Sequence, residues 1–513
     1  MEPDRRRWHD PRVRRRQLLE RAAALPLAGA LAACSGNGSS STRATAPAST
    51  GGPPTLADLQ AQLRGPLLLP GTTHYANASV ISNERYSGVH PQAIARAVLE
   101  ADVAACVRFA ARSSLPFTMR CGGHSYAGYS TNAGLVCDVR RLTTISLAAD
   151  RKSVTVGAGV LAIDLITALA AHGLAVPTGS CPTVGISGLA LGGGVGFAGR
   201  TMGATCDNIL AVRIVTADGR VRVAAPSTNP DLLWACRGGG GGNFGAVTAL
   251  TLATHPVSTA AYGFCDFPWS QAAAALAAWQ GVAPHGPDGL YLICALETGT
   301  SAPQVRVFGQ LLGGSETALR AAMAPITAVA GASLSTGTGA YLAVQQMWAG
   351  CAGESVAACR TIQPSSFAAR SAYVASPLNA AGAGTIVRAI EGRQAAGVGS
   401  GAVLLDPYGG ALNRVAPDAT AFVHRDQLYS AQMLAYWGSA GQGTAADTWL
   451  DGLAGDLRPH TSGQAYQNYI DPGLHGWQQA YYATNLPRLR SIKRTWDPDR
   501  VFRFRQGIPP AAS

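Results

Sequence analysis

Two short segments, each with a nucleophilic side chain in a glycine-bearing turn, are the most informative feature of this chain. The first is Arg120-Cys121-Gly122-Gly123-His124-Ser125, and the second is Gly179-Ser180-Cys181-Pro182-Thr183-Val184-Gly185. Glycine accepts positive φ angles and has no Cβ, so turns of this kind let backbone N–H groups approach a phosphate closely. The two segments therefore predict a site where a phosphate-bearing ligand meets an imidazole and a thiol.

Two glycine runs downstream extend this pattern. They are Gly192-Gly193-Gly194-Val195-Gly196 and Arg237-Gly238-Gly239-Gly240-Gly241-Gly242-Asn243-Phe244-Gly245. A single glycine run is weak evidence, but several that alternate with strand-like segments predict a long phosphate-bearing cofactor that lies along the backbone.

At these residues the chain resembles the berberine-bridge-enzyme-like branch of the vanillyl-alcohol-oxidase / p-cresol methylhydroxylase class of flavoproteins, over about residues 70–510. In that family the histidine of the first turn bonds the 8α-methyl group of FAD, and the cysteine of the second bonds flavin C6. The resemblance implies that His124 and Cys181 form a bicovalent FAD anchor. Taken alone, such a histidine is more often a hydrogen-bonded turn residue, and such a cysteine a small buried apolar side chain.

The resemblance also implies further cofactor contacts in the two turns, in the glycine runs and near the C-terminus. These are Arg120, Cys121, Gly122, Gly123, Ser125, Gly179, Thr183, Val184, Gly185, Gly188, Gly193, Gly194, Gly196, Asn243, Phe244, Tyr466 and Asn468. Val184 resembles the small β-branched position that leaves the flavin open to dioxygen in oxidase members. The alternative for Val184 is ordinary core packing.

The candidate base is Tyr469, because the motif Tyr466-Gln467-Asn468-Tyr469 resembles that of the sugar-oxidising members. An alcohol proton is weakly acidic, so a phenolate is a well-matched base when the hydride leaves. We expect Asp406 to accept the phenolic hydrogen bond and to lower the pKa of Tyr469. The alternative is that Tyr469 is a packed aromatic and Asp406 caps a turn. Weaker candidates for the site are Tyr408 and Tyr466, and for the substrate groove Gln345, Trp348 and Arg414.

The expected fold class is α+β. The resemblance implies a FAD-binding domain of two α/β subdomains and a substrate domain whose antiparallel sheet is backed by helices. The expected boundaries are 1–33 for a signal, 34–70 for a flexible tether and lead-in, 71–257 for the FAD-binding domain, 258–459 for the substrate domain, and 460–513 for a segment that completes the FAD domain.

Apolar periodicity predicts a helix over 91–113, and strands over 116–120 and 134–139 on either side of the histidine turn. The pattern also predicts a hairpin from 209–216 and 221–224. In the second half, helices are expected over 271–279 and 317–330, with strands over 290–296, 304–311 and 402–405.

Composition and charge narrow the function classes. The chain has 513 residues, of which 47% are hydrophobic and 13% charged, so two or three globular domains are expected. Of the net charge of +11, residues 1–33 contribute +4, and no basic run with interleaved aromatics appears in the body. This argues against a nucleic-acid partner. No zinc spacing or acidic cage is visible, so no metal site is predicted.

The N-terminus predicts export. Arg15-Arg16-Gln17-Leu18-Leu19 fits the twin-arginine pattern, and residues 22–33 form an apolar stretch too short to span a bilayer. Leu31-Ala32-Ala33-Cys34 resembles a lipoprotein signal-peptidase box, which would make Cys34 the only link to a membrane. The alternative is plain cleavage and secretion, with Cys34 incidental. Cys351 and Cys359 flank a short polar loop, and a disulfide between them is expected in an oxidising compartment.

The leading hypothesis is an exported FAD-linked oxidase, a monomer, which oxidises an alcohol or hemiacetal carbon of a sugar, oligosaccharide or glycosylated compound and passes electrons to dioxygen. One alternative is a tailoring enzyme or dehydrogenase that acts on a secondary-metabolite ring. Another is a non-catalytic envelope flavoprotein, against which the presence of Tyr469 and Asp406 argues. The substrate cannot be chosen from sequence, because loop side chains determine it.

Overall fold

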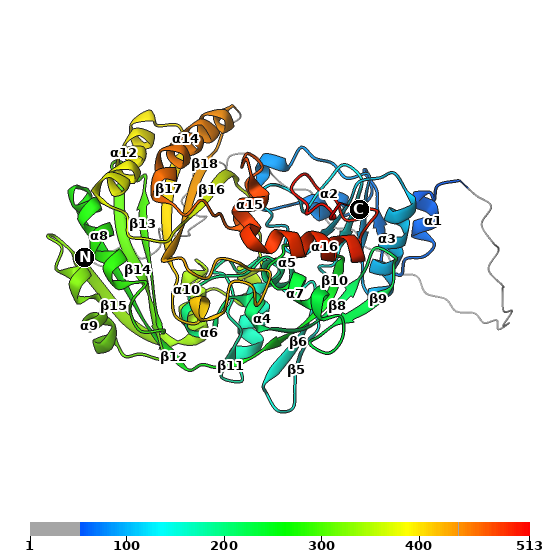
Figure 1. Cartoon of the computed structure of the whole chain (residues 1–513), viewed down its shortest axis with the longest axis horizontal. Coiled ribbons are helices and arrows are strands. Elements are labelled where there is room, and N and C mark those ends of the chain that lie inside the picture. Colours follow the sequence, from blue (N-terminus) through cyan, green and yellow to red (C-terminus); the bar gives the residue numbers. More distant parts are fainter. Residues whose placement is uncertain (1–51, 440, 513) are drawn as a thin grey trace, which may run out of the picture.

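The computed structural model describes residues 52–439 and 441–512, whose larger sheets divide into two units (Figure 1). In the first unit, a four-stranded sheet has the order β1 (Leu67–Leu68), β2 (Ala93–Arg96), β4 (Leu135–Asp138) and β3 (Phe117–Arg120). β2, β4 and β3 pair in parallel, and α3 (Glu100–Arg112) shares a buried apolar core with them. The histidine turn follows directly from the end of β3.

The second sheet of this unit is antiparallel. Its order is β5 (Ile145–Leu147), β6 (Ser153–Gly157), β10 (Ala246–Ala253), β8 (Ile209–Val215) and β9 (Val221–Ala224). The predicted hairpin is confirmed as β8 and β9. Three helices, α4 (Ala162–Ala170), α5 (Ile186–Leu191) and α7 (Pro230–Cys236), contribute buried side chains to the same core. The cysteine turn lies between α4 and α5.

The second unit is a seven-stranded antiparallel sheet. Its order is β15 (Ser333–Ala340), β12 (Thr259–Phe267), β14 (Gln304–Leu312), β13 (Leu290–Glu297), β17 (Ser400–Pro407), β18 (Tyr429–Trp437) and β16 (Ser366–Val374). α8 (Ala272–Val282), α9 (Glu316–Thr327), α12 (Ala380–Ala396) and α14 (Gln442–Leu457) pack on its outer face (Figure 1). The expected α+β class, with an antiparallel sheet backed by helices, is confirmed.

The C-terminal segment returns to the first unit through η6 (Gln467–Tyr469), α15 (Trp477–Tyr482) and α16 (Leu486–Trp496). α16 packs against α7, and the buried Lys493 donates hydrogen bonds from Nζ to the backbone oxygen of Asn243 at 2.6 Å and to Asp497 at 2.5 Å. This contact ties the C-terminal segment to the glycine run that precedes β10.

Two expectations from sequence are wrong. The helix predicted over 91–113 divides into β2 and α3, because parallel pairing with β4 and burial of Ala93, Ile94 and Ala95 outweigh the helical propensity of alanine. The lead-in predicted up to residue 70 already belongs to the first unit. β1 pairs with β2, and Leu59 of α1 (Leu56–Gln60) lies in the core around α3.

The predicted twin-arginine motif and Cys34 lie outside the described residues. Within 52–439 and 441–512, no helix is both long and apolar enough to cross a membrane. The predicted disulfide between Cys351 and Cys359 is present, with the two Cα atoms 5.7 Å apart.

Candidate active site

A cavity of about 1520 Å³ lies where the two units and the C-terminal segment meet. Typical ligand pockets measure roughly 300–1,000 Å³, so this one has room for a large cofactor and a substrate together. Its lining brings both predicted turns into one place, together with residues of the seven-stranded sheet and of η6.

The two turns contact each other backbone to backbone. A Cβ on Gly122 would lie 2.4 Å from the Gly185 nitrogen, and a Cβ on Gly185 would lie 2.1 Å from the Cys121 sulfur. Gly123 has φ +76°, which glycine adopts without strain. Gly122 and Gly185 are therefore required by the contact between the turns, a reason that the sequence did not reveal.

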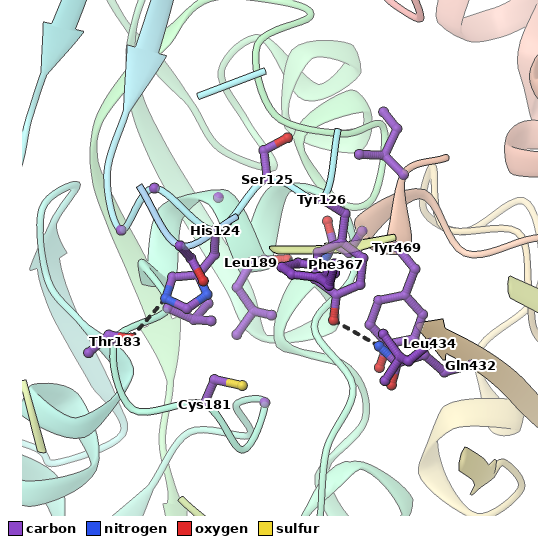
Figure 2. A pocket seen from close by; sticks show the side chains of 18 of the residues that line it. His124, Ser125, Tyr126, Cys181, Thr183, Leu189, Phe367, Gln432, Leu434 and Tyr469 are labelled. Atoms are coloured by element: carbon purple, nitrogen blue, oxygen red, sulfur yellow. Dashed lines mark hydrogen bonds between the residues drawn. The ribbon is translucent and has the colours of Figure 1, made fainter. Parts of the chain in front are cut away.

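His124 and Cys181 face the same hollow from these two turns (Figure 2). The His124 Nε2 atom lies 2.8 Å from the Thr183 hydroxyl oxygen. Burial lowers the pKa of His124 to about 4, so the imidazole is neutral at physiological pH. The Cys181 side chain is exposed to the cavity, and burial of the site raises the pKa of its thiol. A neutral imidazole has a free nitrogen lone pair, as a nucleophile requires.

The predicted cofactor residues divide into two groups. Four of them do not line the cavity: Arg120, Gly193, Gly194 and Phe244. All the others do: Cys121, Gly122, Gly123, His124, Ser125, Gly179, Cys181, Thr183, Val184, Gly185, Gly188, Gly196, Asn243, Tyr466 and Asn468.

Arg120 and Gly194 have structural roles behind the wall. The Arg120 guanidinium is buried and pairs with Asp138 at 3.1 Å, next to the base of the histidine turn. Gly194 has φ +86°, and a Cβ there would lie 2.2 Å from the Thr205 hydroxyl oxygen. Neither residue lines the cavity, so contact of either with a cofactor stays a prediction.

The C-terminal motif is fixed to the glycine run by hydrogen bonds. The Gly194 N–H donates to the Tyr466 hydroxyl at 2.7 Å, and the Asn468 amide donates to the Leu189 carbonyl and to the same hydroxyl, each at 3.0 Å. These contacts set the position of Tyr469, the next residue along η6.

The seven-stranded sheet forms the opposite wall. Because side chains alternate along a strand, one face of its central strands lines the cavity, mostly with alternate residues. The residues are Tyr291, Ile293 and Glu297 of β13, Ala402, Leu404 and Asp406 of β17, and Gln432, Leu434 and Tyr436 of β18.

Asp406 and Tyr469 both line the cavity, but the hydrogen bond predicted between them is wrong. The Asp406 carboxylate accepts a hydrogen bond from the Tyr291 hydroxyl at 3.0 Å. Burial raises the pKa of Asp406 to about 6. The pKa of Tyr469 lies well above its ordinary value, first because of burial and then because the nearby Asp406 charge opposes a phenolate. Asp406 therefore raises the pKa of Tyr469, whereas the sequence argument expected it to lower that pKa.

Tyr126 is a site residue that the sequence analysis missed. Its ring stacks on Tyr469, with centroids 5.3 Å apart, and its hydroxyl accepts a hydrogen bond from the Gln432 amide at 2.8 Å (Figure 2). The buried Asn83 holds this region by donating to the carbonyls of Tyr126 and Phe367. The available signal was the place of Tyr126 two residues after His124.

Of the weaker candidates, Tyr466 lines the cavity, whereas Tyr408, Gln345, Trp348 and Arg414 do not. Gln345 and Trp348 are buried and donate to the Gln310 side chain at 3.2 and 2.9 Å. Arg414 pairs with Asp288 at 2.7 Å on the surface. The buried Tyr408 hydroxyl lies 2.8 Å from that of Tyr373, so neither ring reaches the site.

The match to known families agrees with this geometry. The family described as "FAD binding domain" matches residues 91–225, and the family described as "Berberine and berberine like" matches residues 465–509. These segments hold the histidine turn, the cysteine turn and the Tyr469 motif. The chain is an FAD-linked oxidoreductase.

It belongs to the berberine-bridge-enzyme-like family. It is 32% identical over 438 residues to the uncharacterised FAD-linked oxidoreductase YgaK of Bacillus subtilis, covering 84% of this chain and 93% of that protein. Its structure is similar to that of Physcomitrella patens BBE-like 1, with a TM-score of 0.82 and 30% identity, and the match covers 90% of this chain and 100% of that one. It is also similar to chitooligosaccharide oxidase, with a TM-score of 0.80 and 25% identity, and the match covers 89% of this chain and 100% of that one.

Proposed function

We propose that this oxidoreductase is an exported oxidase that acts on a CH–OH carbon of a sugar or oligosaccharide and passes the electrons to dioxygen. One observation carries the proposal: Tyr469 and Asp406 face the cavity that also receives His124 and Cys181. Proteins of similar structure include chitooligosaccharide oxidase and, at TM-score 0.79 and 27% identity, the xylooligosaccharide oxidase of Myceliophthora thermophila in complex with xylobiose.

Residues 121–125 of the histidine turn, the cysteine turn (179–185) and the glycine run at 240–242 form one wall of the cavity, the flavin-domain wall. Its residues fit FAD held by two covalent bonds, one to His124 and one to Cys181. A Cβ on Gly188 would meet nothing within 4 Å, and Gly240, Gly241 and Gly242 line the same wall with backbone. The neutral imidazole of His124 and the cavity-facing thiol of Cys181 are the nucleophiles proposed for the two bonds, whereas burial raises the pKa of the Cys121 thiol, which also lines the cavity. When bound, FAD supplies the hydride acceptor of the reaction.

Residues of the seven-stranded sheet and of η6 bind the substrate hydroxyl and accept its proton. Tyr469, oriented by its stacking on Tyr126, holds the substrate hydroxyl through its own hydroxyl. A Tyr469 phenolate is disfavoured, so the proton must continue to a group that accepts it more readily. Asp406, with its pKa raised to about 6, is ionised at neutral pH and accepts the proton there. Tyr291 keeps this carboxylate in place through its hydrogen bond.

Val184 is the candidate for oxygen access. It lies in the cysteine turn just before α5, and its side chain lines the cavity. A small side chain at this point leaves room beside the flavin, and a Val184→Leu variant should lower the rate of flavin reoxidation by dioxygen without changing the reductive step.

An oxygen-uptake screen with peroxide detection, run against mono- and oligosaccharides, tests the function. Uptake matched by equal peroxide for a sugar supports the proposal. Flavin that a sugar reduces without oxygen uptake would instead show a dehydrogenase. Reduction by none of the sugars, but by an aromatic alcohol, would favour the tailoring alternative.

Targeting needs a separate experiment. Replacement of Arg15 and Arg16 by lysine should block export, since both arginines belong to the twin-arginine pattern. Cys34→Ser should move the protein from the membrane fraction to the soluble fraction if Cys34 carries the lipid. Unchanged fractionation of the Cys34→Ser protein would mean plain cleavage and secretion.

A further inference from the structure

Glu297 is an acidic side chain in the cavity that the proton path does not use. It ends β13 and faces the cavity together with Tyr291 and Ile293 of the same strand. In the sheet it pairs with Ala402 of β17, four residues before Asp406. A strand rises about 3.3 Å per residue, so Glu297 lies about 13 Å along the sheet from Asp406. This distance separates it from the reacting end of the site.

The neighbours of Glu297 leave space at its carboxylate and offer neutral polar groups around it. Ala402, beside it on β17, is small. Gln304 is its partner on β14, and Gln394 and Ser400 also line the cavity. These amides and hydroxyls can bind sugar hydroxyl groups without any charge. The Glu297 carboxylate adds a negative charge, which the binding of sugar hydroxyl groups does not require.

The charges in the cavity favour a positive ligand. Of the cavity-lining residues that the structure describes in the seven-stranded unit, Glu297 and Asp406 are the acids and none is Lys, Arg or His. This contrasts with the excess of basic over acidic residues in the whole chain. On the other side, Glu84 and Arg503 both line the cavity, and His124 is neutral.

Arg306 of β14 is a base whose positive charge acts on Glu297 and lowers its pKa. It forms an ion pair with Asp266 of β12, so its charge is already partly compensated. Arg393 of α12 is not among the cavity-lining residues, and its guanidinium lies over Trp449. Among the described lining residues of this unit, no base offsets the charge of Glu297, and Arg306, which is not a lining residue, offsets it only in part.

We propose that Glu297 forms a distal subsite that binds a protonated amino group, so that the preferred substrate is an amine-bearing oligosaccharide oxidised at its other end. The inference rests on the proposed function for the reaction at that other end. A Glu297 carboxylate that meets an ammonium group gains a charge-assisted hydrogen bond, about twice as strong as a neutral one.

The electrostatics of Glu297 support the subsite. Burial raises the pKa of Glu297 to about 7, because protein replaces water around the carboxylate. An opposite charge close to a carboxylate favours its ionised form. A bound ammonium group would therefore restore the ionised carboxylate, whereas a neutral hydroxyl would do so only weakly.

Three β-1,4-linked trimers with one backbone test the subsite: glucosamine with a free amine, N-acetylglucosamine with an acetamide, and cellotriose with a hydroxyl at the same carbon. Binding to the flavinated protein is measured by calorimetry at pH 7, and turnover by oxygen uptake. The unmodified protein should bind the glucosamine trimer most tightly. Glu297→Gln should weaken that trimer about 10- to 100-fold and change the other two less than about threefold.

Glu84→Gln is the matched control, because it removes another cavity-lining acid and should leave the order of the three trimers unchanged. An equal loss for all three trimers in Glu297→Gln would overturn the amine subsite and make Glu297 a hydroxyl acceptor. No loss for the glucosamine trimer would remove Glu297 from binding. Amine-selective binding without oxidation of any trimer would sustain the subsite and contradict the proposed function, so the two failures are distinguishable.

Discussion

The two walls of the cavity are built on different principles. The flavin-domain wall consists of turns that meet backbone to backbone, as at Gly122 and Gly185, and its chemistry is concentrated in His124 and Cys181. The opposite wall is a sheet whose side chains on one face line the cavity. A substitution at Gly122 or Gly185 forces neighbouring backbone to move, whereas a side chain that faces the cavity from the sheet can be replaced singly. One scaffold can thus keep its cofactor and vary its substrate.

The largest effect should come from the two nucleophiles of the flavin-domain wall. His124→Ala and Cys181→Ala should each keep the flavin covalently bound, since the other bond remains. The double variant should release all of its flavin when precipitated with acid. Flavin fluorescence of the pellet and the supernatant measures this. Release from one single variant would mean that the other residue forms no bond.

On the opposite side of the cavity, Tyr469→Phe should slow flavin reduction by about 10²- to 10⁴-fold, the usual contribution of a proton-transfer group. Its covalent flavin content should equal that of the parent, since Tyr469 lies apart from the attachment turns. Anaerobic stopped-flow reduction by a sugar substrate provides the rate. A rate within a few-fold of the parent would make Tyr469 a packing residue.

The pH dependence of Asp406 sharpens the comparison further. With its pKa raised to about 6, Asp406 is protonated below this pH and cannot accept a proton. The reduction rate of the parent should therefore rise with pH through about 6 and then level off. Asp406→Asn should be slower by about 10²-fold and lose this rise. An unchanged midpoint in Asp406→Asn would assign the titration to another group.

The smallest effect should appear in the packing of the flavin-domain wall. Gly122→Ala places a methyl group 2.4 Å from the Gly185 nitrogen and should destabilise the protein by about 3 kcal/mol. Gly392→Ala is the control, because its methyl group meets nothing within 4 Å and the residue is in α12, away from the cavity. Denaturant midpoints of the two variants give the comparison. Equal midpoints would show that the two turns can move apart.

The features that could be predicted from sequence are local ones. The histidine and cysteine turns, the β8–β9 hairpin and the Cys351–Cys359 disulfide each depend on a few neighbouring residues, and for this reason they were found. The division of residues 91–113 into β2 and α3 was missed, because a strand that pairs with β4 cannot be recognised from its own alanine-rich sequence.

The chemistry of the sheet wall depends on register between distant strands. Tyr291 reaches Asp406 because β13 and β17 are adjacent, and Tyr126 reaches Tyr469 because the C-terminal segment returns to the first unit. No local pattern contains these contacts. The sequence therefore pointed to Asp406 and Tyr469 as candidates but assigned Asp406 the wrong hydrogen-bond partner.

Peptide mass spectrometry of the unmodified, flavin-loaded protein tests the central claim most directly, because it needs no substrate. After proteolysis that cuts between the two turns, we expect one flavin that links a peptide containing His124 to a peptide containing Cys181. The linked mass should disappear in either single variant, leaving flavin on the remaining peptide. FAD recovered free from the acid-treated protein, with both peptides at their unmodified masses, would contradict the account.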